Sequence, residues 1–332
     1  VDLSRHRARP IDPHVVAAEP ARPRLSEDRA RIDPRAIGAL GTTRTMMTAV
    51  RVMSSDRVSV AIHEFGGSGR PLLLSHATGF HGYCYLPIAD RLAERFTSYA
   101  LDYRGHGSTP RPDDWQVDWH RYGDDALAAA RAIAPDGGLI GFGHSMGGAG
   151  LLMAAHRDPG LFDLIVAFEP IVFPTDVDRS DAEPSALVEG ARRRRQSFDS
   201  FEAAIDNYSS KPPMQFFDPD VLRLYVGHGF RPAPEGVRLT CAPEHEARTF
   251  ETGATHDTWD LLPEIATRVV VIASGDDMGP AQAAPGVAER LPNSLLIEQP
   301  DANHFGPFID PAGTADLIAD MTAALRTGSG EM

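Results

Sequence analysis

The chain has 332 residues, of which 42% are hydrophobic, so it is long enough to bury one large core. Acidic residues outnumber basic ones by 46 to 32, and the net charge of −14 argues against a nucleic-acid partner. No apolar run approaches the roughly 20 residues that a transmembrane helix needs, so we expect no integral membrane span.

The first part of the chain, residues 1–45, is rich in Arg, Pro, Asp and Ala and shows no sustained periodicity. We expect an irregular extension there. It lacks the apolar core of a secretion signal, and acidic residues such as Asp12 and Glu27 count against an organelle transit peptide, which predicts a cytoplasmic protein. An arm that covers the mouth of a site or forms a homodimer is a further possibility for this extension.

Strand-like and helical patterns alternate through residues 46–172 and again through 263–328. The first strands and helices of this alternation are expected at 58–62, 72–74, 86–95 and 119–133. Alternation of this kind builds a mostly parallel sheet with helices on both faces, an α/β architecture. Such a sheet places its functional site at the carboxyl ends of the strands.

The most informative motif is Gly143-x-Ser145-x-Gly147, which follows an apolar strand-like run and precedes a small-residue, apolar helix. This is the pattern of a nucleophile elbow, in which a strand turns so sharply into a helix that the serine hydroxyl projects from a strained backbone. A dinucleotide-binding fingerprint would need a third glycine at position 146, which is methionine. Ser145 is therefore the candidate nucleophile.

A serine hydroxyl needs a base and a carboxylate that orients the base. His304 lies in a polar loop after a strand-like run and is the candidate base. Asp277 follows the β-branched run 267–273 and is preferred over its neighbour Asp276 as the carboxylate. Glu169, at the end of an earlier strand, is the rival acid.

Almost a hundred residues separate the strand that ends near Ile171 from the one that begins near Arg268, far more than an ordinary connection. Helical periodicity recurs within this stretch, at 186–195, 198–208 and 221–227. We therefore predict that residues 173–262 form a helical insertion.

From about residue 57 to 326 the chain resembles the α/β-hydrolase superfamily of serine hydrolases, which includes lipases, esterases and haloperoxidase-like enzymes. Four landmarks in the right order carry the resemblance: the loop 75–80, the loop 102–108, the elbow, and the acid and histidine loops. The family resemblance implies a mostly parallel eight-stranded sheet, a lid, and an oxyanion hole formed by the backbone amides of Thr78 and Met146. Ala77 departs from the usual glycine of the first loop.

The resemblance and the serine elbow together predict hydrolysis of a carboxylic ester, or a related acyl bond, through an acyl-enzyme. Alternatives on the same fold are perhydrolysis, acyl transfer and carbon–carbon bond hydrolysis, and a non-catalytic ligand receptor remains a different class. The expected partner is a small ester or acyl substrate with an apolar part. No metal or cofactor motif stands out, and neither is expected. Candidate pocket residues are Phe80, Tyr83, His144, Phe173 and Trp259.

Overall fold

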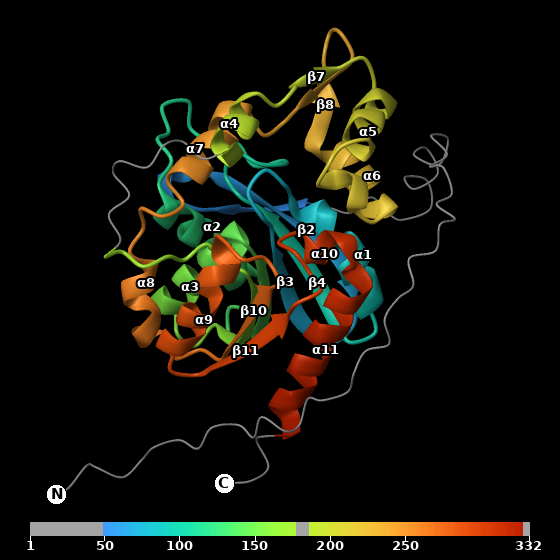
Figure 1. Cartoon of the computed structure of the whole chain (residues 1–332). Helices are drawn as coiled ribbons and strands as arrows, with labels where there is room; N and C mark the ends of the chain where they lie inside the picture. The colour runs from blue at the N-terminus through green and yellow to red at the C-terminus, as the bar shows by residue number, and fades with distance from the viewer. Residues whose placement is uncertain (1–48, 177–185, 328–332) are drawn as a thin grey trace, which may run out of the picture. The chain divides into compact units, whose positions relative to one another are not determined.

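The computed structural model describes residues 49–176 and 186–327, so the N-terminal extension predicted at residues 1–45 lies outside the described part. At the centre of the described part is an eight-stranded sheet with strand order β1-β2-β4-β3-β5-β6-β10-β11 (Figure 1). Its strands are β1 (Ala49–Met53), β2 (Ser59–Gly67), β3 (Arg70–Ser75), β4 (Phe96–Asp102), β5 (Leu139–His144), β6 (Phe162–Phe168), β10 (Val269–Ser274) and β11 (Ser294–Gln299).

The sheet is mostly parallel, as the sequence predicts. Strand β2 pairs antiparallel with both β1 and β4, and every pair from β4 through β3, β5, β6 and β10 to β11 is parallel. Because the parallel strands share one direction, the residues that follow β3, β5, β6, β10 and β11 all emerge at the same edge. This edge collects the loops that carry the predicted site residues.

Helices cover both faces of the sheet (Figure 1). On β3, Leu72 and Leu74 pack into one apolar cluster and Leu73 into the other, as the two-residue period of a strand requires. The first cluster includes residues of α1 (Leu86–Leu92) and α11 (Pro311–Thr327). The second includes residues of α2 (Trp119–Ile133), α3 (Met146–Arg157) and α9 (Pro280–Arg290). Strands buried on both faces explain the near-continuous apolar runs in the sequence.

A large insertion separates β6 from β10 and contains helices, as predicted, together with a small three-stranded sheet that the sequence pattern did not indicate. Its main elements are α4 (Ala186–Arg192), β7 (Ser197–Phe198), α5 (Phe201–Ser209), α6 (Pro219–Gly229), β8 (Phe230–Pro232), β9 (Val237–Leu239), α7 (Pro243–Glu251) and α8 (Thr258–Leu261), with 3-10 turns at Met214–Phe216 and Leu262–Glu264. Aromatic residues of the insertion, including Tyr225, join the same apolar cluster as Phe80. The insertion is therefore packed onto the core.

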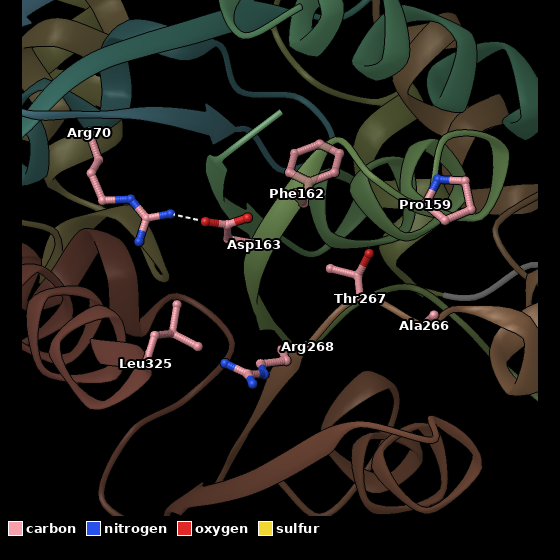
Figure 2. A pocket seen from close by; sticks show the side chains of 8 residues that line it. All are labelled: Arg70, Pro159, Phe162, Asp163, Ala266, Thr267, Arg268 and Leu325. Atoms are coloured by element: carbon pink, nitrogen blue, oxygen red, sulfur yellow. Dashed lines mark hydrogen bonds and ion pairs between the residues drawn. The ribbon is translucent and has the colours of Figure 1, made fainter. Parts of the chain in front are cut away.

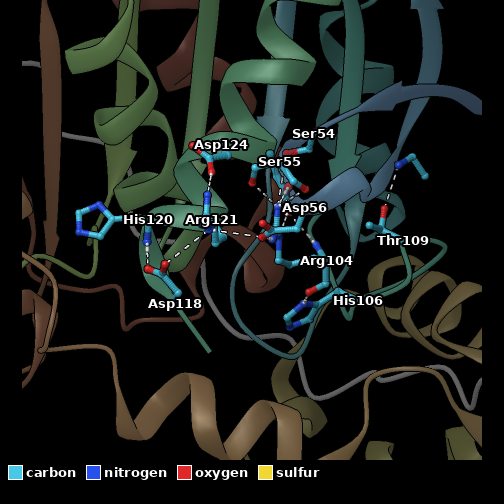
Figure 3. Close-up of polar contacts among 12 residues, drawn as sticks. Ser54, Ser55, Asp56, Arg104, His106, Thr109, Asp118, His120, Arg121 and Asp124 are labelled. Atoms are coloured by element: carbon cyan, nitrogen blue, oxygen red, sulfur yellow. Dashed lines mark hydrogen bonds and ion pairs between the residues drawn. The ribbon is translucent and has the colours of Figure 1, made fainter. Parts of the chain in front are cut away.

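The loop after β4 is held by buried charges. Arg104 is fully buried, and its guanidinium donates to both carboxylate oxygens of Asp125. It also donates to Asp56 (Figure 3). One Asp102 oxygen accepts from the Gly82 amide and the other from the Ser108 amide. These contacts hold the loop after β4 in place.

No helix within the described ranges is both long enough and apolar enough to cross a membrane.

Candidate active site

Ser145 stands on a sharp turn between β5 and α3. Its backbone has φ 59° and ψ −117°, a conformation that is strained for a residue with a Cβ, and its side chain is buried at 4% exposure. The turn is fixed because the Ser145 amide donates to the Phe168 carbonyl at 2.9 Å. The predicted nucleophile elbow is thus present in the backbone.

The two glycines of the motif are required by close backbone approach. A Cβ on Gly143 would lie 2.6 Å from the Gly148 Cα, and one on Gly147 would lie 2.1 Å from the Ser75 carbonyl oxygen. Both separations are far below van der Waals contact, so no side chain fits at either position.

We expect Gly147→Ala to destabilise the fold by about 1–3 kcal/mol or more, because the Ser75 backbone must move to admit the methyl group. Gly160→Ala is the matched control, since a Cβ there would meet nothing within 4 Å. Denaturant titration of both variants measures the difference. Equal midpoints for the two would contradict the close approach of the elbow to Ser75.

The predicted oxyanion amides lie on either side of the elbow. Met146 begins α3, and Thr78 lies in the loop after β3, buried at 4% exposure. Among the hydrogen bonds of the described residues, none is donated by the amide of Thr78 or Met146. Ala77 is tolerated where the family usually has glycine because the left-handed backbone of this loop falls on Gly79, at φ +81°.

His304 is paired with Glu169. Its Nδ1 lies 2.5 Å from Glu169 Oε2, and the other Glu169 oxygen accepts from the Ser274 amide at 2.7 Å. Glu169 is fully buried. Burial by itself would raise the pKa of Glu169, but the hydrogen bonds and charge of His304 and the bonds from Ser274 outweigh it, so this pKa is lowered.

In the structure the His304 ring contacts Glu169, the rival acid, and not Asp277, the preferred one. The Nδ1 atom of a neutral imidazole takes part in one hydrogen bond, and in His304 the partner is Glu169. Asp277 is exposed to solvent. Asp276 does reach His304, but its Oδ2 accepts from the backbone amide at 2.8 Å and leaves the ring untouched. The strand register explains why Glu169 lies close to the elbow. His144 of β5 pairs with Phe168 of β6, so the residues that follow them, Ser145 and Glu169, leave the sheet at the same point along the two strands.

His144, which precedes the nucleophile, connects the elbow to the histidine loop. Its Nε2 lies 2.8 Å from the His304 carbonyl oxygen and its Nδ1 lies 2.9 Å from the Tyr85 hydroxyl. Burial lowers the pKa of His144 well below the usual value, so the ring is neutral. Since a carbonyl only accepts, Nε2 must donate, and Tyr85 must donate to Nδ1.

Tyr85 also accepts from the Ala77 amide at 3.1 Å. A single chain of hydrogen bonds therefore runs from the loop before Thr78, through Tyr85 and His144, to the backbone of His304. Among the described residues, no hydrogen bond joins the Ser145 hydroxyl to His304. The chain ties the residue before Ser145 to the backbone of His304.

The geometry agrees with the comparison to known families. Residues 72–317, well over half of the chain, match the model of the alpha/beta hydrolase family. The chain belongs to that family. Two relatives and one solved structure each cover most of it. The 2-(acetamidomethylene)succinate hydrolase of Mesorhizobium japonicum is 26% identical over 277 residues, which are 82% of this chain and 95% of the relative.

A second relative is the pimeloyl-[acyl-carrier protein] methyl ester esterase of Chromobacterium violaceum, which is 27% identical and covers 79% of this chain and 96% of its own length. Among solved structures, that of an E-2-(acetamidomethylene)succinate hydrolase aligns with a TM-score of 0.70. It shares 24% sequence identity and covers 82% of this chain and 98% of its own, so it supports the fold. The alpha/beta hydrolase assignment thus rests on sequence and on architecture.

The predicted pocket residues of this hydrolase fall in different places. Phe80 packs against Phe305, the neighbour of His304, with ring centroids 6.4 Å apart. Tyr83 stacks on His228 at 3.6 Å. Trp259 packs under Arg290 of α9, which is a contact of the core. Phe173 is half-buried in the segment after β6. The structure therefore brings Phe80 and His144, but not Trp259, to the histidine.

Two surface cavities of the hydrolase lie elsewhere. One, of about 450 Å³, is at the amino ends of β3, β6 and β10, where Arg70 pairs with Asp163 (Figure 2). It is at the opposite edge of the sheet from Ser145. The other, of about 430 Å³, lies between the loop after β4 and the insertion and is lined by Arg51, Arg111 and Arg231. The described residues contain no cluster of three or more metal-ligating side chains.

Proposed function

We propose that this alpha/beta hydrolase cleaves a carboxylic ester or related acyl bond, with Ser145 as nucleophile, His304 as base and Glu169 as the carboxylate that orients the base. The observation that carries the proposal is the 2.5 Å contact between His304 Nδ1 and buried Glu169, in a fold that also holds Ser145 on a strained elbow. This arrangement supports Nδ1–H donation to Glu169, which leaves Nε2 free of a proton.

In the proposed mechanism, His304 Nε2 takes the hydroxyl proton as Ser145 Oγ attacks the acyl carbon. Negative charge develops on the former carbonyl oxygen, and the amides of Thr78 and Met146 receive it. The leaving group departs with the proton from His304. Water, activated by the same ring, then attacks the acyl-enzyme and releases the acid.

The two relatives support an acyl bond as the target. One is named for hydrolysis of an acetamido-bearing succinate and the other for a methyl ester. The insertion supports a lid role, because Phe80 of the core packs against Tyr225 of α6 at 5.3 Å and against Phe305 beside the histidine. The insertion therefore adjoins the reacting groups.

The proposal predicts a single covalent adduct when the protein is incubated with a fluorophosphonate, located on Ser145 by peptide mass spectrometry. Esters of increasing acyl length should then be hydrolysed at graded rates, and prior labelling should abolish the turnover. Heat-denatured protein is the control, since it keeps every serine but loses the elbow. Labelling at other serines only, or turnover that survives stoichiometric labelling of Ser145, would overturn the assignment.

A further inference from the structure

The insertion contains an ion pair with a buried carboxylate that the mechanism above does not use. Arg194, just after α4, lies 3.1 Å from Glu246 Oε1 on α7. The Glu246 side chain is 1% exposed. Carboxylates are rarely buried to this degree unless they are paired and fully hydrogen-bonded. The burial of the Glu246 carboxylate is therefore not explained by packing alone.

Glu246 reaches the loop that carries the proposed oxyanion amide. A Cβ on Gly79 would lie 2.2 Å from Glu246 Oε1, so this carboxylate packs directly on the residue that follows Thr78. It comes from the insertion and meets the core at the loop after β3, next to Thr78. Of the acidic residues on α7, Glu246 is the one with this contact, whereas Glu244 and Glu251 pair with surface arginines.

The pairing of Glu246 is incomplete. Its Oε2 is buried and has no hydrogen-bond partner among the described residues. Arg194 does not supply the missing bond, because its second nitrogen donates to the Tyr225 hydroxyl at 3.1 Å. Burial raises the pKa of Glu246 although Arg194 opposes the rise. A buried acceptor without a donor destabilises the fold unless a ligand supplies the donor.

We propose that Glu246 is a specificity-determining residue whose free oxygen accepts a hydrogen bond from an N–H or O–H group of the substrate, close to the scissile carbonyl. This inference rests on the proposed acyl-bond hydrolysis and narrows its substrate class to acyl compounds that carry such a donor. Phe80, the residue after Gly79, packs in an aromatic cluster with Phe217, Tyr225 and Phe308. In an apolar site, one polar group rejects substrates that leave it unpaired.

The test compares two methyl esters, of N-acetylglycine and of 4-oxopentanoic acid, which differ by an N–H in place of a CH2. We expect the native enzyme to favour the N–H ester by about 10- to 100-fold in kcat/KM, the range for hydrogen bonds to charged groups. Glu246→Met, which removes the acceptor at similar length, should reduce this ratio to about 1. Glu246→Gln retains a carbonyl oxygen and should restore part of the preference.

The alternative role for Glu246 is to hold Arg194 and the insertion in place. In that case Glu246→Met lowers the rates of both esters alike and leaves their ratio unchanged, which overturns the proposal. Equal hydrolysis of the two esters by the native enzyme would also overturn the proposal, and this result needs no variant. Failure of the underlying function has a different signature, because neither ester is then hydrolysed and Ser145 is not labelled by a fluorophosphonate.

Discussion

Ser145→Ala is expected to lower kcat for ester hydrolysis by about 10⁴- to 10⁶-fold, the size of effect that loss of a triad nucleophile produces. The loss is specific to chemistry, because alanine keeps the Cβ and therefore the same backbone strain at φ 59°. The folded state should survive with an unchanged melting temperature. Steady-state kinetics and thermal unfolding of the same preparation measure the two quantities.

Ser145→Gly separates strain from chemistry. Glycine adopts positive φ readily, so this variant should be as inactive as Ser145→Ala but more stable by about 1–3 kcal/mol. If both results are obtained, the backbone strain at Ser145 lowers the stability of the fold, and the hydroxyl that it carries is required for activity. Native-like hydrolysis by pure, folded Ser145→Ala would instead show that another group attacks the acyl carbon.

The elbow could be predicted from sequence because its requirements are local. A strand, two glycines that flank the serine, and a helix of small residues occur within one short window, and the structure reproduces each of them. The parallel sheet was predictable for the same reason, since the buried strands are continuous apolar runs. The family match over residues 72–317 agrees with both.

The carboxylate could not be chosen from sequence because both candidates follow a parallel strand. Glu169 follows β6 and Asp277 follows β10, and sequence spacing does not say which one reaches the histidine ring. The decision depends on strand register and on the path of the histidine loop. One available signal was that Glu169 directly follows an apolar strand and precedes Pro170, whereas Asp277 lies beyond Gly275 and Asp276 in an exposed turn.

Glu246 was missed for a related reason. On α7 it looks like one of several acidic residues of a charged helix, and its contact with Gly79 joins segments far apart in the chain. The strands β7, β8 and β9 were missed because two or three residues are too few to show a period. In both cases the information lies in tertiary contacts.

Glu169→Gln is expected to reduce kcat by roughly 10⁴-fold, the effect of placing the histidine proton on the wrong nitrogen. Glu169 accepts two hydrogen bonds, one from the Ser274 amide and one from His304 Nδ1. A glutamine has one acceptor oxygen for these two donors. If that oxygen stays with Ser274, the amide nitrogen faces Nδ1, and the proton moves to Nε2, where it blocks general-base catalysis.

Asp277→Asn is the matched control, because this side chain is exposed and the histidine ring is already engaged by Glu169. We expect it to change kcat by less than about twofold. Steady-state kinetics with one ester substrate compare the two variants. The opposite pattern, a large loss with Asp277→Asn and a small one with Glu169→Gln, would move the acid to the end of β10.

The pH dependence of stability tests the same contact without any substrate. The pKa of Glu169 is lowered in the folded protein from its ordinary value of 4.5, so its ionised form stabilises the fold. This contribution is complete above the unfolded pKa and is lost as the pH falls through the lowered folded value. The difference in unfolding free energy between the native protein and Glu169→Gln should therefore be constant near neutral pH and shrink below about pH 4.5. A difference that grows on acidification would mean that Glu169 is protonated in the folded state, and a protonated Glu169 could not stabilise a charged His304.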